Sequence, residues 1–433
     1  MSHRHISKAR HAVLALGLLV LGEFANAQNP KQDAKPAAPK EGLTVQTEIR
    51  LRGENRDSFS FDSAISDDPH DQLFRIRPNI TWQQKDGTRL FLQPQFSYGH
   101  NFGGMTSTGS YKDLDIHQGY ADLKQMGMKW RIGRQELIYG DQRLIGNGNW
   151  GNLGRSFDAI KATVADKHTK TDMFYGKLGQ ATARTSDPVI GGIYSTVAPN
   201  KKMTYDLYAL YKSVDITKTT FQNIYTVGTR PKFAIGQFDG TVEAAYQFGS
   251  YASRSVQAMA YSANFGYSIP KAAGLRLSLE HNYATGGKTT GTGTYRLFDQ
   301  LYPTNHSLYG IQDFVGWRNM KEWRLGAKAK PAAKWNVMAD GHMFYLVDGT
   351  DSWYGDGGKV VTGANGSALK DATGASGRDL GTEFDFVVEY LPLKGLSIQG
   401  GYARFNPGDF VKKTNGGKAD SSQWFYLQTT YSF

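Results

Sequence analysis

The stretch TVQTEIRLR, residues 44–52, alternates apolar or small side chains with polar ones along its whole length. Successive side chains of a β-strand point to opposite faces, so this period of two predicts a strand with one apolar and one charged face. The same alternation recurs in QLFRIRPNI (72–80), LRLSLEHNY (275–283) and TEFDFVVEY (382–390), and helical periodicity is nearly absent after residue 43. The pattern predicts a sheet of many strands whose two faces differ in polarity.

Eighteen strands are predicted, the first at 43–53 and the last at 421–433. Several span about ten residues, the length that crosses a bilayer at a tilt. Short turns such as 85–87 alternate with long connections such as 136–155 and 284–320. A soluble sandwich would also alternate, but with shorter strands. The chain therefore predicts an all-β fold, a transmembrane antiparallel up-and-down β-barrel of about 18 strands with short periplasmic turns and long extracellular loops.

The composition agrees with a membrane barrel and narrows the class of partner. The 433 residues include 24 Tyr, 23 Phe and 8 Trp, whose apolar rings and polar tips suit a membrane interface. Lys and Arg number 50 against 39 Asp and Glu, a net charge of +11 that indicates anionic partners. Cysteine is absent, which excludes disulfides and thiolate metal sites.

The two ends of the chain carry patterns that predict secretion and assembly into a membrane. Basic residues precede an apolar run at 12–21, and Ala25-Asn26-Ala27 follows as a small-x-small cleavage site, so residues 1–27 are predicted to be a signal peptide. The run has about half of the roughly 20 residues that a membrane anchor helix needs. Residues 28–42 are predicted to be a disordered periplasmic leader, and residues 43–433 the barrel. The terminal WFYLQTTYSF, ending at Phe433, resembles the signal that such barrels present to the barrel-assembly machinery.

The segment GRQELIYGDQRLIGNGNWGNLGRSFDAI, residues 133–160, is rich in glycine and in charge. It resembles a signature of the alginate export family of Gram-negative outer-membrane β-barrels. The matching residues are Gly133-Arg134-Gln135, Tyr139-Gly140-Asp141, Arg143-Leu144-Ile145-Gly146, Trp150, Asn152 and Arg155-Ser156-Phe157-Asp158. Residues 246–249, 298–310 and 403–411 also look like blocks of this family. The resemblance implies a bacterial outer-membrane location, an arginine-lined pore and alginate as the default substrate.

Strand parity places many charged residues on the inner face of the predicted barrel. Arginine suits a carboxylate ligand because its planar fork donates two parallel hydrogen bonds. The predicted pore and substrate path consists of Arg50, Arg52, Arg75, Arg77, Arg131, Arg134, Arg143, Arg155, Arg276 and Arg324. The predicted acidic partners are Glu48, Glu136, Asp141, Asp158, Glu383 and Asp385. The alternative is that the arginines pair with these acids and only brace the wall.

Two groups of these residues receive a more specific interpretation. Arg50 and Arg52 are expected to lie across from Arg75 and Arg77 on the next strand, as a first candidate for a constriction. Residues 133–160 are expected to form the extracellular end of a hairpin that folds back over the mouth. In this interpretation Arg134, Arg143 and Arg155 sit at the outer rim as a braced gate, with Glu136, Asp141 and Asp158 as their partners.

Several motif matches carry little weight. Residues 146–151 match the pattern G-x-G-x-x-G but open no helix, which argues against nucleotide binding. The acids at 67–71 and 348–356 could hold calcium in an outer loop, but no EF-hand spacing is present, which favours solvated loop acids. His306 and Asp313 lie in one long loop, without a credible serine partner for a hydrolase.

The sequence thus predicts a monomeric outer-membrane channel that exports an acidic polysaccharide, alginate or a related polyuronate. No enzyme activity, cofactor, metal or nucleic acid is expected. The expected partners are outer-membrane lipid, the assembly machinery and periplasmic export proteins. One alternative is an anion-selective porin for uptake of small sugar acids. A barrel hydrolase and a purely structural barrel or adhesin are further alternatives.

Overall fold

A computed structural model describes residues 41–65, 70–101, 111–179, 188–217, 220–287 and 291–433. The predicted signal peptide, the leader up to residue 40 and the acids at 67–68 lie outside the described residues. In the described part of the chain, no helix is long and apolar enough to cross a membrane.

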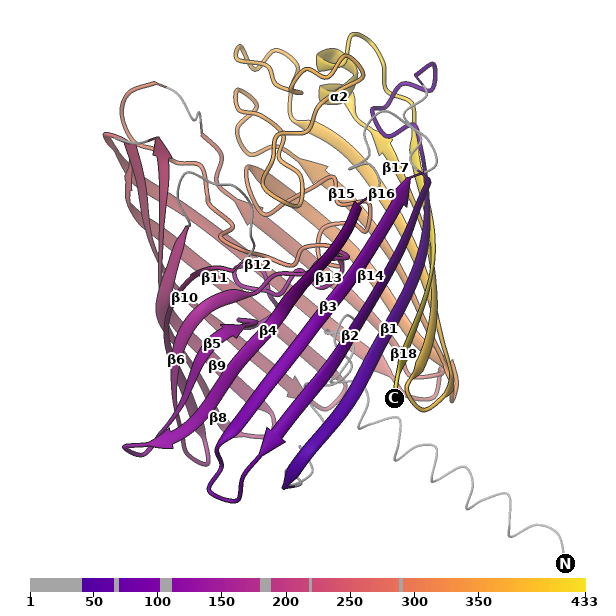
Figure 1. Ribbon diagram of the computed structural model, residues 1–433. Coiled ribbons are helices and arrows are strands. Elements are labelled where there is room, and N and C mark those ends of the chain that lie inside the picture. Colours follow the sequence, from indigo (N-terminus) through magenta and orange to yellow (C-terminus); the bar gives the residue numbers. More distant parts are fainter. Residues whose placement is uncertain (1–40, 66–69, 102–110, 180–187, 218–219, 288–290) are drawn as a thin grey trace, which may run out of the picture.

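The described strands form one antiparallel sheet of 18 strands, in which each strand pairs with its neighbours in the sequence. The ring closes because β1 also pairs with β18, for example Arg50 with Thr430 (Figure 1). The strands are β1 (Gly42–Asp57), β2 (His70–Gln83), β3 (Arg89–Asn101), β4 (Tyr111–Gln125), β5 (Met128–Gln135), β6 (Phe157–Ala165), β7 (Thr169–Leu178), β8 (Val189–Asn200), β9 (Met203–Thr217), β10 (Thr220–Ile235), β11 (Phe238–Tyr251), β12 (Arg254–Ile269), β13 (Leu275–Ala284), β14 (Met320–Ala332), β15 (Trp335–Tyr345), β16 (Asp379–Leu393), β17 (Leu396–Pro407) and β18 (Ser422–Ser432).

The predicted strand count and topology are confirmed, and each of the 18 predicted spans overlaps an observed strand. The alternation of the first strand appears as two different faces. Leu43, Val45 and Leu51 are exposed on the outer surface of β1, whereas Arg50 and Arg52 are buried on its inner face. In a membrane the apolar outer face meets lipid, and closure of the ring satisfies the hydrogen bonds that an open edge would leave unpaired.

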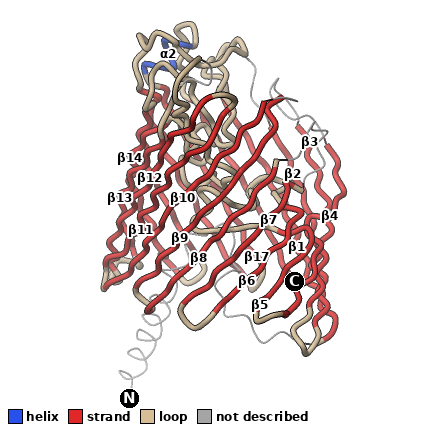
Figure 2. The backbone as a smooth tube through the Cα atoms, turned by 90° about the vertical axis from the view of Figure 1, so that its left-hand side faces the viewer, coloured by secondary structure: helices blue, strands red, loops and turns tan. Residues whose placement is uncertain are grey.

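Two long connections fold into the barrel, where Figure 2 shows loop segments running inside the ring of strands. The first inner loop (residues 136–156) joins β5 to β6, and the second inner loop (residues 294–319) leads into β14. They pair with each other at a parallel bridge between Ile145 and Tyr302. Gly146 N donates to Tyr302 O at 2.8 Å, and Tyr302 N donates to Leu144 O at 2.8 Å.

The main apolar cluster joins the inner loops to the wall and to the connections at the long-loop end of the barrel. Phe61, Phe298, Phe314, Trp317 and Trp353 are all buried in this cluster. The connection 346–378 and the short helix α2 (Asp409–Thr414), the one helix among the described residues, lie at the end of the barrel that carries the long loops. The expectation that residues 133–160 fold back over the mouth is corrected here, because the first inner loop enters the lumen.

Candidate functional site

The strand register brings four inward-facing arginines together on β1 and β2. Arg50 lies directly opposite Arg75, and Glu48 lies opposite Arg77. The side chains of all four arginines are buried, and that of Arg75 is only 1% exposed. Of the four, only Arg50 and Arg75 are direct partners across the strands, because Arg52 lies opposite Leu73. We call Arg50, Arg52, Arg75 and Arg77 the arginine cluster.

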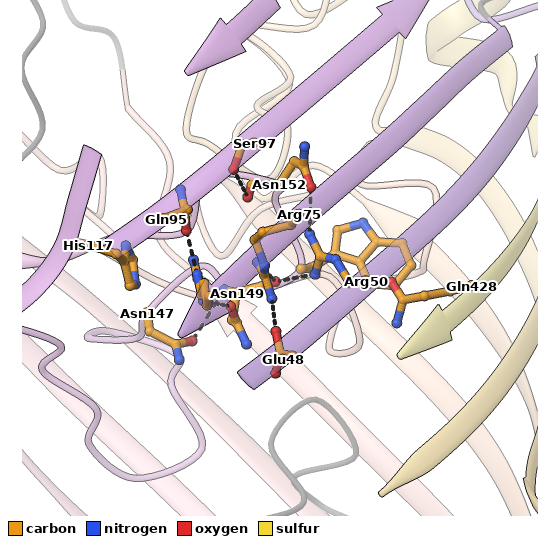
Figure 3. A network of polar contacts seen from close by, with 12 residues as sticks. Glu48, Arg50, Arg75, Gln95, Ser97, His117, Asn147, Asn149, Asn152 and Gln428 are labelled. Carbon is orange, nitrogen blue, oxygen red and sulfur yellow. Dashed lines mark hydrogen bonds and ion pairs between the residues drawn. The ribbon is translucent and has the colours of Figure 1, made fainter. Parts of the chain in front are cut away.

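The arginine cluster holds the first inner loop by its backbone (Figure 3). Arg50 donates to Asn149 O at 2.7 Å, to Gly151 O at 3.1 Å and to Asn152 Oδ1 at 3.2 Å. Arg52 donates to Trp150 O at 2.8 Å, and Arg77 donates to Leu153 O at 3.0 Å. The loop thus offers a row of oxygen acceptors to a row of guanidinium groups, halfway along β1.

Neighbouring polar side chains on β3 complete the same contact. Gln95 Nε2 donates to Leu153 O at 3.1 Å, and Ser97 Oγ donates to Asn152 O at 3.2 Å. Asn152 in turn donates to the carbonyl oxygens of Phe74 and Tyr98, both at 3.1 Å. These bonds tie the loop to three adjacent strands, so that its position in the lumen is fixed by the wall.

The cluster keeps a positive charge even though its donors are largely satisfied. Glu48 pairs with Arg75 at 2.8 Å and Glu54 pairs with Arg52 at 2.6 Å. The acceptors of Arg50 and Arg77 described above are neutral carbonyl and amide oxygens, which accept hydrogen bonds without cancelling a charge. Like charges held this close raise the local potential, which favours any anion that can reach them.

Glu136 is the acid at the start of the first inner loop. Burial alone would raise the pKa of its carboxyl group, but the hydrogen bond and charge of His117 and the charge of Arg77 hold that pKa below its usual value. His117 Nε2 lies 2.9 Å from Glu136 Oε1, and Asn147 donates to the other oxygen at 3.1 Å. The carboxylate therefore braces the loop from within rather than facing an arginine at the rim.

Arg143 and Arg155 lie deep in the barrel, and this corrects their predicted place at the outer rim. Arg143 donates to Glu280 in the middle of β13 at 2.7 Å and to Tyr309 Oη at 2.7 Å. Arg155 donates to Tyr302 O at 2.7 Å and to Pro303 O at 2.8 Å, in the second inner loop. Their partners are therefore the far wall and the second inner loop, because the first inner loop crosses the lumen.

The other predicted rim residues are divided between the two faces of the wall. Asp141 pairs with Arg230 of β10 at 2.9 Å, inside the barrel. Arg134 and Asp158 pair at 2.7 Å, but they share the outward parity of Ile132, which is exposed on β5. This pair lies on the outer surface of the wall, near the long-loop end, and does not face the lumen.

The remaining predicted arginines bind acids on the wall, on the adjacent strand for Arg131 and Arg324 and two strands away for Arg276. The acceptors of Arg131, Arg276 and Arg324 are Asp122 at 2.7 Å, Asp239 at 2.6 Å and Asp340 at 2.5 Å, respectively. These three pairs match the bracing interpretation, since both partners of each lie on the wall.

The predicted acids of β16 hold the second inner loop. Glu383 accepts from the backbone N–H of Gln312 at 2.9 Å, and Asp385 accepts from that of Ile311 at 3.1 Å. His342 Nε2 lies 3.1 Å from Asp385. The first inner loop is thus anchored on β1–β3 and the second on β16, which only β17 and β18 separate from β1 around the ring.

An aromatic stack joins the arginine cluster to the second inner loop. The guanidinium of Arg52 lies 3.9 Å from the ring centroid of Trp150. The ring of Trp150 also stacks on that of His306, at a centroid distance of 3.7 Å and an interplanar angle of 7°. His306 Nδ1 lies 3.0 Å from Asp313. The predicted loop residues His306 and Asp313 therefore pack between the loops.

Several site residues were missed by the sequence analysis. Lys212 of β9 pairs with Asp299 at 2.8 Å and holds the second inner loop from a further side. Gln95 and Ser97 could have been found by strand parity, because both fall on the inner face of β3. The carbonyl acceptors at 149–153 carry no such signal, since every residue has a carbonyl group.

No group of His, Asp and Glu side chains in the described ranges is arranged to hold a metal ion. The acids of the 348–356 segment, considered above for calcium, serve local structure instead. Asp348 accepts from Thr350 N at 2.9 Å, and Asp351 accepts from Tyr354 Oη at 2.9 Å.

Comparisons with known proteins agree with this architecture. The alginate export family model matches residues 41–425. No curated protein sequence matches the chain. Among solved structures, Pseudomonas aeruginosa OccK5 (OpdH) has a TM-score of 0.61 at 12% identity, over 90% of this chain and 98% of that chain. Pseudomonas aeruginosa OccD3 (OpdP) has a TM-score of 0.60 at 11% identity, over 91% of each chain.

At these identities the likeness to the Occ proteins concerns the fold alone, a porin-like barrel of the outer membrane. The family match is of a different kind, because it covers the sequence from the start of β1 into β18. It includes the first inner loop that the arginine cluster holds. The chain therefore belongs to the alginate export family of outer-membrane β-barrels.

Proposed function

We propose that this barrel is an outer-membrane channel that exports an anionic polysaccharide, alginate or a related polyuronate, through its arginine-rich lumen. The observation that carries the proposal is the arginine cluster, whose buried guanidinium groups donate mainly to neutral loop oxygens. Membership of the alginate export family supports it. A polyuronate presents one carboxylate per sugar, and a series of weak contacts with arginines would lower the barrier along its path.

The geometry suggests how such a chain would pass the first inner loop. The carbonyl oxygens at 149–151 occupy the donors of Arg50 and Arg52. A uronate carboxylate accepts from the same donors and forms stronger, charge-assisted hydrogen bonds. The polymer would therefore replace the loop on the arginines, and the loop would return once the carboxylate has moved on. No covalent chemistry is involved.

Uptake of small sugar acids is the second candidate function. It is favoured by the pairing of the two inner loops across the lumen, which narrows the space available to a polymer. In that case the loops would stay in place, and only small anions would pass between them and the wall.

Planar-bilayer recordings with the purified full-length barrel test the proposal. We expect a reversal potential in a salt gradient that shows anion selectivity, and a current that oligouronate blocks whereas a neutral oligosaccharide of equal length does not. Cation selectivity would refute the proposal. Currents carried by glucuronate and left unblocked by oligouronate would favour the uptake channel instead.

A further inference from the structure

A cavity of about 280 Å³ lies on the inner wall formed by β5, β6 and β7. Its lining has four cationic side chains, two carboxylates, a threonine and an isoleucine. These residues are Lys129, Arg131, Glu136, Ile138, Lys161, Thr163, Lys170 and Asp172. The cavity is separate from the arginine cluster, which lies on β1 and β2.

The cavity belongs to the short-turn half of the barrel. Lys129 and Lys170 are each the second residue of their strand, directly after a short turn. Their side chains are 46% and 60% exposed, whereas that of Lys161 is 15% exposed. Short turns of such barrels face the periplasm. Two exposed lysines thus mark the periplasmic side of the cavity, with a more buried lysine further in.

Four cations line this cavity and three acids contact the group: the lining acids Glu136 and Asp172, and Asp122, which pairs with Arg131 and Lys129 at 2.7 and 3.1 Å. Asp172 is the carboxylate nearest to Lys161 and Lys170, at 3.7 and 3.6 Å, which is beyond hydrogen-bond distance. It already accepts from Thr163 at 2.7 Å and from Tyr139 at 3.2 Å. The other lining acid, Glu136, is engaged by His117 and Asn147, as described above. Two ammonium groups therefore keep donors for a further anion.

We infer that this cavity is a docking site for one carboxylate-bearing sugar unit that arrives from the periplasm. The inference rests on the proposed function and deepens it. The carboxylate would lie between Lys161 and Lys170, and Ile138 would contact the apolar edge of the sugar ring. Ligand pockets for drug-sized molecules measure roughly 300–1,000 Å³, so a cavity at the lower limit suits a single sugar.

The site also touches the element that the polymer must displace. Glu136 and Ile138, which line the cavity, begin the first inner loop, and the arginine cluster holds residues 149–153 of that loop. A docked uronate is therefore in contact with the near end of the loop while the arginines hold its far end. Docking places the chain next to the loop before the loop opens.

The test compares side-specific block of the current in bilayers that contain oriented full-length barrels. The test variant carries Lys161→Gln and Lys170→Gln, and the control carries Lys271→Gln, an exposed lysine in the turn between β12 and β13. We expect the concentration of oligouronate that blocks from the periplasmic side to rise roughly tenfold or more in the double variant. Block from the extracellular side and block in the control should match the wild type.

The outcomes separate the two proposals. A wild type that is neither anion-selective nor blocked by oligouronate refutes the proposed function and the docking site with it. A wild type that is blocked, and a double variant that matches the control, refute the docking site alone. Lys170→Glu at an exposed position provides a second variant if the double variant does not fold, and it should weaken periplasmic block further. Competition by inorganic phosphate as strong as that by glucuronate would overturn the assignment to a sugar acid.

Discussion

Replacing Arg50 by lysine separates the hold of the arginine cluster on the first inner loop from its positive charge. The Arg50 guanidinium reaches three acceptors of the loop, at 2.7, 3.1 and 3.2 Å. Lysine keeps the charge, but its ammonium is a point donor on a flexible stem and cannot reproduce the planar fork. Arg50→Lys should therefore loosen the loop and leave the anion selectivity of the channel nearly unchanged.

The expected size of the effect follows from the lost contacts. A hydrogen bond to a charged group contributes about 1.5–3 kcal/mol, and the substitution removes roughly two of them. Arg75 donates to the same carbonyl oxygens of Asn149 and Gly151, both at 3.3 Å, and compensates in part. A net loss of about 2–3 kcal/mol raises the ratio of displaced to docked loop about 30- to 140-fold, since 1.4 kcal/mol corresponds to a factor of ten.

Single-channel recording measures this ratio as the fraction of time spent at high conductance. The matched control is Arg276→Lys, because Arg276 also faces the lumen but binds Asp239 on the wall and no inner loop. We expect more frequent and longer openings for Arg50→Lys and a wild-type record for Arg276→Lys. An Arg50→Lys channel with wild-type openings would refute the role of the Arg50 hydrogen bonds in holding the loop. The positive charge, which lysine keeps, would then be enough to hold the first inner loop in place.

Two further predictions follow from the same contacts. Substitution of Arg75 and Arg77 by glutamate should weaken or reverse anion selectivity, measured as the reversal potential in a salt gradient, and unchanged selectivity would make both residues wall braces. Burial raises the pKa of Asp313 to about 8 and lowers the pKa of His306 to about 3, from an ordinary value of 6.5. Between pH 6.5 and 8, Asp313 is protonated in the docked second inner loop and ionised in a displaced one, whereas His306 is neutral in both. The docked loop therefore binds more protons and loses stability as the pH rises. Current fluctuations should increase over that interval in the wild type and depend less on pH in Asp313→Asn, where Asp356, whose pKa burial raises to about 7, still titrates. A wild type without this pH dependence would contradict the reasoning.

The wall of the barrel could be predicted from the sequence because its physical signal is local. Alternation within each strand fixes which side chains face inward, so the inner position of Arg50 and its juxtaposition with Arg75 follow from parity and a short connection. The glycine-rich segment 133–160 was also identified as a special, charged element. The contacts that this segment makes with the strands of the wall could not be predicted.

The missing information was long-range. Arg143 meets Glu280 across 137 residues, and Arg50 meets Asn149 across 99 residues. No local pattern specifies such partners, and the acceptors of the arginine cluster are mostly backbone carbonyls. Strand parity places Arg134 on the outer face with Ile132, and the prediction missed this because it grouped Arg134 with the loop that follows β5.

The anchoring of the inner loops on distant strands has a consequence for the order of folding. Residues 149–153 dock on β1–β3, Arg143 docks on β13, and the second inner loop docks on β16. These contacts can form together only after strands from the whole circumference have assembled, since contacts that close long stretches of chain form late. The inner loops should therefore be the last unit to fold and the first to unfold, with the ring of strands intact around them. A late-folding unit inside a stable ring is a part that the barrel can release and recover without losing its place in the membrane.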